Sequence, residues 1–177
     1  MAAILKHYID RSNLKVIGVT TEVEYNEFFS GDALKRRFEK IIIKEPTVDV
    51  LEQIIDKVIN DYCIKSGISF ERDFIRKEIV NSIVSATSKN RRVYNDIVNN
   101  PDLSISIIDR AFALAKVYDS QFITIDHFIE SFEYCDRIYA SAKELTIARL
   151  NSLNELNKSV SKQASKVLKI DFNRLKR

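Results

Sequence analysis

Apolar residues recur at intervals of three and four along most of the chain after Pro46. Residues at this spacing share one face of an α-helix, so each such segment predicts an amphipathic helix that buries one side. Four helices are expected, and their bounds in chain order are Thr47 to Gly67, Ser69 to Ala86, Asn100 to Tyr118 and Thr124 to Tyr139. The pattern predicts a mainly α protein.

Residues at the ends of these segments support the assignment. Thr47 and Asn100 are typical N-cap residues, and Pro101 suits a first helical turn because its missing N–H needs no partner there. The polar run from Thr87 to Arg92 is expected to be the loop that leaves the second helix.

Two apolar runs near the N-terminus have the composition of buried strands. The first, Leu14 to Val19, ends in Thr20 and Thr21, so it would deliver two hydroxyl groups to the C-terminal edge of a sheet, where open α/β sheets bind ligands. The second run is Ile41 to Ile43. Taken alone, the two threonines are also explained by ordinary β-propensity.

Composition bounds the class of protein. The chain has 177 residues, 45% of them hydrophobic and 30% charged, which is enough for one domain with an appendage or for two small domains. A net charge of +3 is too small to indicate nucleic-acid binding by itself. No run reaches the roughly 18 apolar residues of a membrane span, and no signal-peptide pattern opens the sequence. A cytoplasmic protein is expected, with Cys63 and Cys135 as buried free thiols.

The last part of the chain has two interpretations. A narrow apolar stripe through Leu145, Leu153, Leu156 and Val160 predicts a helical extension of roughly 20 residues that packs on the preceding helices or on another chain. The segment from Lys158 to Arg177 is basic, which is typical of a solvated helix face, a frayed terminus or a surface that binds acidic partners.

Four short motifs before the first long helix carry a resemblance. In chain order they are Gly18-Val19-Thr20-Thr21, Val23-Glu24-Tyr25, Arg36-Arg37-Phe38 and Glu45-Pro46. This order resembles the first ATPase module of the Clp family of AAA+ unfoldases. The resemblance implies that Thr21 is the first sensor residue, with Thr20 beside it at the nucleotide. It also implies that Arg36 and Arg37 are arginine fingers that face the nucleotide of the neighbouring subunit. Without this match, the two arginines would read as a solvated pair at the end of a helix.

The third expected helix extends the resemblance. Its start, Asn100-Pro101-Asp102-Leu103-Ser104-Ile105-Ser106-Ile107-Ile108-Asp109-Arg110-Ala111, is similar to the family's Leu-Pro-Asp-Lys-Ala-Ile-Asp-Leu-Ile-Asp-Glu-Ala. Four helices in this order resemble the helical lid of AAA+ modules. Leu103 stands where the family has a lysine, in a region that approaches bound nucleotide. The 177 residues contain three glycines and no glycine-rich phosphate-binding loop.

The resemblance therefore implies three parts. Residues 1–46 would be the C-terminal remnant of an AAA+ α/β core with one or two strands, residues 47–139 an AAA+ helical lid, and residues 140–177 a helical, basic C-terminal extension. The catalytic residues would be Thr21, Arg36 and Arg37, and the nucleotide-binding residues Thr20 and Thr21. No metal-ligand set is expected.

The implied function is that of a fragment or truncated form of a Clp-like ATPase that unfolds or remodels proteins and is not active alone. ATP and Mg would be cofactors of the complete protein, and none is expected for this chain by itself. The complete protein would be a ring-shaped homo-oligomer that acts on protein substrates, with or without a protease partner. The alternative is a non-catalytic helical interaction module derived from an AAA+ lid. Nucleic-acid binding through the basic tail has the least support.

Overall fold

The computed structural model describes residues 15–29, 35, 37–93 and 99–174, with the backbone alone for residue 28 and residues 163–174. The chain divides into two compact units, Met1–Lys44 and Glu45–Arg177. Each unit is described below by itself.

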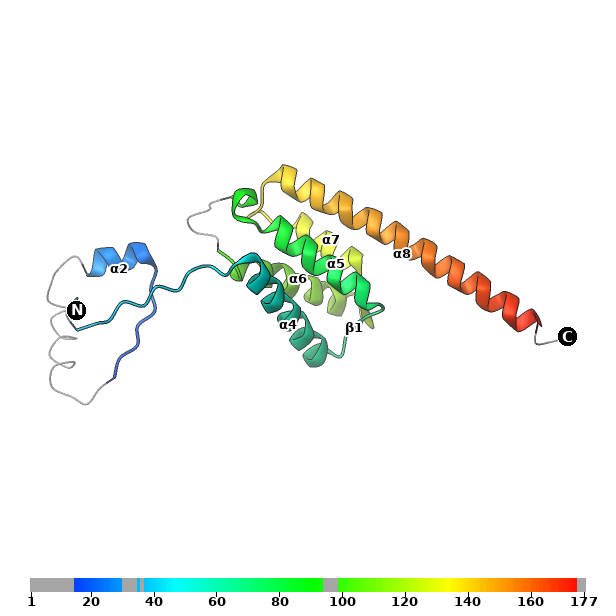
Figure 1. Ribbon diagram of the computed structural model, residues 1–177, viewed down its shortest axis with the longest axis horizontal. Helices are drawn as coiled ribbons and strands as arrows, with labels where there is room; N and C mark the ends of the chain where they lie inside the picture. Colours follow the sequence, from blue (N-terminus) through cyan, green and yellow to red (C-terminus); the bar gives the residue numbers. More distant parts are fainter. Residues whose placement is uncertain (1–14, 30–34, 36, 94–98, 175–177) are drawn as a thin grey trace. The chain divides into compact units, whose positions relative to one another are not determined.

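The second unit is built from helices (Figure 1). They are α4 (Val48–Ser66), α5 (Asp73–Ala86), the short 3-10 helix η1 (Lys89–Arg91), α6 (Asp102–Val117), α7 (Ile125–Glu133) and α8 (Ala140–Arg174). Two short strands, β1 (Ser69–Phe70) and β2 (Phe122–Ile123), pair in parallel. The expected mainly α class is confirmed.

The first and second expected helices differ in how well their starts were predicted. Thr47 occupies the N-cap position of α4, and Gly67 ends this helix in the left-handed conformation with a φ of 72°, which glycine adopts without steric cost. The predicted start of the second helix at Ser69 is wrong. Ser69 and Phe70 pair with Phe122 and Ile123, so their backbone is extended and α5 begins only at Asp73.

The later helices also begin and end at other residues than the periodicity predicts. Pro101, not Asn100, is the residue before the first turn of α6. The fourth helix does not run to Tyr139, because α7 ends at Glu133 and α8 starts at Ala140. The break is held by backbone pairing with a distant segment: Val93 N–H donates to the carbonyl of Arg137 at 3.0 Å and Tyr139 N–H to that of Arg91 at 2.9 Å.

One core joins α4 to α8 and is dominated by aliphatic and phenylalanine side chains. The largest fully buried side chains are Ile55, Ile59, Ile79, Ile83, Leu103, Ile107, Ile108, Phe112, Ile123, Ile125, Phe128 and Phe132. Full burial of one such side chain contributes about 1.5 to 3 kcal/mol, so the hydrophobic faces of these helices hold the unit together.

The first half of α8 belongs to this core. Ala142, Thr146 and Leu150 are buried against the other helices, and α8 lies along α5 and α7 before it continues past them (Figure 1). Four side-chain hydrogen bonds add to the packing: Arg149 with Glu78, Asn154 with Asp126, Arg72 with Asn157, and Arg72 with Ser161. Of the two interpretations of the extension, packing on the preceding helices therefore holds as far as Ser161.

The first unit contains the short helix α2 (Glu22–Phe28) among the described residues. The predicted buried strands are not formed there: residues 15–20 and 38–44 have no strand assignment, and Ile17 and Ile43 are 94% and 91% exposed. A strand needs hydrogen-bonded neighbours and covering layers, and the described residues of this unit supply neither. Leu14 and the expected helix at residues 2–10 lie outside the described residues.

Candidate functional site

The two threonines implied as nucleotide-facing residues are engaged with one carboxylate. Thr21 is the N-cap of α2, and its hydroxyl accepts from the Glu24 N–H at 3.2 Å and donates to Glu24 Oε2 at 3.0 Å. The hydroxyl of Thr20 donates to the same Oε2 at 2.9 Å. The Thr21 N–H and both hydroxyls lower the pKa of Glu24, so this carboxylate stays ionised and keeps the capping box closed.

The two arginines implied as fingers are described unequally. Arg36 lies outside the described residues, and Arg37 is exposed next to Phe38, whose ring packs edge-on against Phe29 at 5.5 Å between centroids. A nearby exposed cation, Lys40, bonds Glu22 at 3.2 Å and lies 4.7 Å from the ring centroid of Tyr25. In this unit the structure therefore places Thr20 and Thr21 together at the start of α2, and it places Arg37 in a separate turn.

A second polar cluster lies where the chain enters the helical unit. Oε1 of Glu45 accepts from Nη1 of Arg92 at 2.6 Å and from the backbone N–H of Asn100 at 2.5 Å. The side chain of Arg92 is only 3% exposed, whereas that of Glu45 is 28% exposed. A charge-assisted pair of this kind, with one partner out of water, holds its geometry more firmly than a surface ion pair.

The charge state of Glu45 follows from its surroundings. Burial alone would raise the pKa of this carboxyl, but the hydrogen bonds from Arg92 and Asn100, with the positive charges of Arg92 and Lys89, together lower it. Glu45 is therefore ionised at neutral pH and accepts from both donors.

Asn100 extends this cluster into the core. Its side-chain amide donates to the carbonyl of Thr87 at 3.0 Å and lies 3.2 Å from the Thr87 hydroxyl, while its side-chain oxygen accepts from Ser104 at 2.8 Å. The hydroxyl oxygens of Thr87 and Ser104 are 2.9 Å apart, and both residues are fully buried. The end of α5 and the start of α6 are thus joined by a buried hydrogen-bond network that includes Glu45 at its outer edge.

The residue at the family's lysine position has a structural role here. Leu103 is fully buried in the first turn of α6 and belongs to the core. An aliphatic side chain without solvent exposure cannot bind a phosphate group, so this position offers no contact to a nucleotide.

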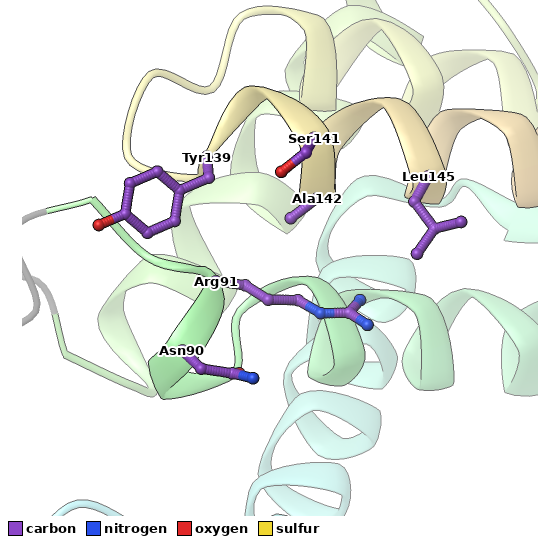
Figure 2. Close-up of a pocket in the computed structure, with 6 residues that line it drawn as sticks. All are labelled: Asn90, Arg91, Tyr139, Ser141, Ala142 and Leu145. Carbon is purple, nitrogen blue, oxygen red and sulfur yellow. The ribbon is translucent and has the colours of Figure 1, made fainter.

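An open pocket of about 240 Å³ lies between η1 and the start of α8. Figure 2 shows its lining, with Arg91 and Asn90 on one side and Tyr139, Ala142 and Leu145 on the other. Arg91 donates from Nη1 to the hydroxyl of Ser85 at 3.0 Å, so its guanidinium is held along the wall. The lining has one basic group, Arg91, and the hydroxyls of Tyr139 and Ser141, but no carboxylate or imidazole that could act as a base beside them, so it does not define a reaction.

Two further properties concern the described part of the chain only. Its His, Cys, Asp and Glu side chains form no group of three that could hold a metal ion. None of its helices combines the length and the apolar character that crossing a bilayer requires.

Sequence reasoning missed the Glu45 cluster. In the sequence Glu45 is only the end of a motif, Arg92 belongs to a predicted exit loop and Asn100 is a predicted N-cap. The signal available in the sequence was the opposite charge of two residues, because the carboxylate of Glu45 and the guanidinium of Arg92 can neutralise each other. Their separations of 47 and 55 residues, however, are invisible to local periodicity.

Comparison with known proteins places the chain in a family. It is 32% identical over 146 residues to the chaperone protein ClpB of Mycoplasma genitalium, which covers 81% of this chain and 19% of that protein. It is 29% identical over 114 residues to the ATP-dependent Clp protease ATP-binding subunit ClpE of Bacillus subtilis, covering 64% and 15%. It is 32% identical over 117 residues to the heat shock protein hsp98 of Neurospora crassa, covering 66% and 12%. No family model matches, and no solved structure matches.

The helical unit and these similarities together define a segment of an AAA+ ATPase. The chain belongs to the Clp family of AAA+ ATPases. It spans about an eighth to a fifth of the length of the curated relatives that it matches.

Proposed function

We propose that this chain supplies the sensor, arginine-finger and lid segment of a Clp-like machine that uses ATP to unfold or remodel proteins. The observation that carries the proposal is the similarity to chaperone ClpB over 146 residues, which is 81% of the chain. The complete protein would bind ATP and Mg through residues outside those described, act as a homo-oligomeric ring on protein substrates in the cytoplasm, and work with or without a protease partner.

The residues present fit only part of a nucleotide site. Holding the phosphates of ATP requires a nest of backbone N–H groups, a lysine and a metal held by a side-chain oxygen. The described residues offer none of these together, and Leu103 is buried where the family has lysine. The chain's own contribution would be limited to the transition state: Thr21 would orient a water molecule, and Arg36 and Arg37 would neutralise charge on a neighbouring subunit's phosphate.

The domain bounds belong to the same proposal. Residues 1–46 would be the end of the AAA+ large subdomain, residues 47–139 the lid and residues 140–177 the extension. The division of the chain after Lys44 supports the first of these bounds. The packing of Leu150 into the core supports a lid that also includes the first half of α8.

The decisive experiment is a chimera. The segment of Mycoplasma genitalium ClpB that aligns with this chain is replaced by this chain, and ATP hydrolysis and recovery of a heat-aggregated reporter enzyme are measured. An active chimera is expected. In it, Arg36→Ala and Arg37→Ala should each lower the ATPase rate by a factor on the order of a thousand, since an arginine finger contributes about that much.

Lys35→Ala is the matched control, because Lys35 is an exposed cation beside the same turn. It should leave the rate within about twofold of the unsubstituted chimera, since an exposed charge away from a specific contact contributes little. Full activity of both arginine variants would refute the finger assignment, and an inactive chimera would refute the proposed function.

A non-catalytic interaction module is the second candidate. It is favoured by the exposed apolar side chains of α8, Leu145, Leu156 and Val160, which are 59%, 62% and 47% exposed. A chain of this kind would associate with a partner in the absence of nucleotide. The chimera separates the two candidates, because an interaction module would not support ATP hydrolysis in place of the ClpB segment.

A further inference from the structure

Glu45 is the first residue of the helical unit and is bonded to two loops of that unit. The residues before it, from Ile41 to Lys44, are exposed and have no regular secondary structure. Glu45 is therefore the point at which hydrogen bonds of the helical unit hold the chain next to residues 41–44.

The first contact of Glu45 reaches the start of α8. Its partner Arg92 lies in an antiparallel bridge with Ile138, which is flanked by the hydrogen bonds of Val93 to Arg137 and of Tyr139 to Arg91. This bridge fixes the connection between α7 and α8. A shift of α8 along its axis would thus displace Arg92 and the carboxylate that it holds.

The second contact reaches the start of α6. The N–H of Asn100 donates to Glu45, while the side chain of the same residue is bonded to Thr87 and Ser104. Because Asn100 is buried and bonded on both sides, it cannot rotate independently of α6. A single oxygen atom, Oε1 of Glu45, is therefore tied to the beginnings of both α6 and α8.

We propose that Glu45 is a positioning residue that couples movements of the helical unit to the segment carrying Arg36 and Arg37. A carboxylate clamped between Arg92 and Asn100 moves with these helices and draws the linker with it. Without the clamp, the linker detaches at Glu45 and the arginine segment no longer follows the helices. The coupling to arginine fingers rests on the proposed function, whereas the clamp itself does not.

The clamp is tested on the full chain by limited trypsin digestion, because cleavage after Lys44 needs the surrounding linker to open. Arg92→Met removes the ion pair and leaves the cleavage sequence unaltered. It should raise the rate of cleavage after Lys44 at least fivefold, while cleavage after Lys40, which precedes the clamp by several residues, stays within twofold; both are order-of-magnitude expectations for local opening. Arg91→Met is the matched control, because Arg91 bonds Ser85 and not Glu45.

Folding is checked in the same samples by circular dichroism. If Arg92→Met proves unfolded, Glu45→Gln replaces it: its side-chain oxygen can still accept from both donors but carries no charge, so it should give a smaller increase. An unchanged rate of cleavage after Lys44 in the folded variant would refute the clamp.

The coupling is tested in the chimera described above. Glu45→Ala should lower kcat for ATP at least tenfold and leave the KM for ATP within twofold, because Glu45 touches no nucleotide but positions residues that act in the transition state; this size is an order-of-magnitude expectation. Glu45→Gln should recover part of kcat. An unaltered kcat in Glu45→Ala would overturn the coupling even if trypsin supports the clamp. An inactive unsubstituted chimera would instead count against the proposed function, and the trypsin result would still decide the clamp.

Discussion

The side-chain amide of Asn100 donates a hydrogen bond of 3.0 Å to the backbone carbonyl of Thr87, and both residues are buried. The contact joins the end of α5 to Asn100, which lies two positions before the first residue of α6. An amide group inside a core of aliphatic and phenylalanine side chains is stabilising only while its partners are in place, because an unsatisfied buried group costs about 1 to 3 kcal/mol.

Asn100→Ala should therefore lower the free energy of unfolding by about 2 to 4 kcal/mol, since the hydroxyls of Thr87 and Ser104 and the Thr87 carbonyl would lose a partner. Urea unfolding followed by circular dichroism measures the change. Asn99→Ala is the control, because the adjacent asparagine is exposed and should stay within about 0.5 kcal/mol of the unsubstituted protein. Equal effects of the two variants would contradict a structural role for the buried network.

Two leucines of α8 should differ sharply although they lie only five positions apart. Leu150 is fully buried and Leu145 is 59% exposed. Leu150→Ala should destabilise the protein by about 2 to 5 kcal/mol, because it leaves a cavity, and Leu145→Ala by less than about 0.5 kcal/mol. Thermal or urea unfolding of the two variants gives the comparison. Similar effects would show that α8 is not part of the core.

The packing of α8 on the other helices predicts which truncated fragments of the helical unit fold stably. A fragment of residues 45–162 keeps Ala142, Thr146 and Leu150 and should unfold cooperatively. A fragment of residues 47–139 lacks these side chains and also Glu45, which bonds Arg92 and Asn100. It should be less stable by several kcal/mol, at about 1.5 to 3 kcal/mol for each large buried side chain. Circular dichroism through a thermal melt tests both. A higher melting temperature for the shorter fragment would contradict this prediction.

His127 should make the stability of the protein depend on pH. Its Nδ1 accepts from the Thr124 N–H at 3.0 Å at the start of α7, so the neutral ring closes the capping box. Burial lowers the pKa of His127 below its ordinary value of 6.5, although the nearby carboxylates of Asp126 and Glu130 oppose the shift. Tyr118, the residue after α6, stacks on the ring, and Asn154 of α8 donates a hydrogen bond to Asp126.

The direction of this pH dependence follows from proton binding to His127. The unfolded chain binds a proton at this histidine more readily than the folded one, so the contribution is fully present above about pH 6.5 and is lost as the pH falls through the lower, folded-state pKa. Urea unfolding between pH 7.5 and pH 5, taken as roughly the range over which an ordinary histidine titrates, measures the loss. His127→Gln can still bond the Thr124 N–H but stays neutral, and should flatten the dependence over that range. An unaltered dependence would assign it to other groups.

The chain by itself is not expected to bind ATP. Isothermal calorimetry with ATP and Mg should show no binding in the low micromolar range, which corresponds to about −7 to −8 kcal/mol. The physical reason is that a tetra-anionic ligand loses its hydration without a phosphate nest to replace it. The active chimera of the proposed function is the positive control. Micromolar binding by the chain alone would reveal a nucleotide site that its described residues do not suggest.

The amphipathic pattern by itself determined which segments are helical and which faces are buried. Ile55, Ile83, Ile107 and Phe128 lie on the faces that the spacing predicts, because burial of one helical face repeats every three to four residues in the sequence. The end of α4 was also predictable from local sequence. Gly67 adopts a left-handed backbone conformation that is sterically less favourable for other residues. The motifs from Gly18 to Pro46 carried the family resemblance.

Only the tertiary structure decided which backbone groups pair over long distances. Ser69 reads as a helix cap, but pairing with Phe122 makes it part of a strand. The stripe through Thr124 to Tyr139 reads as one helix, but the bridge between Arg92 and Ile138 requires a break. Glu45 and Arg92 are 47 positions apart, so the helical repeat of three to four residues does not predict their contact. The apolar runs ending at Val19 and Ile43 show the converse, because strand-like composition forms a strand only where a neighbouring strand completes its hydrogen bonds.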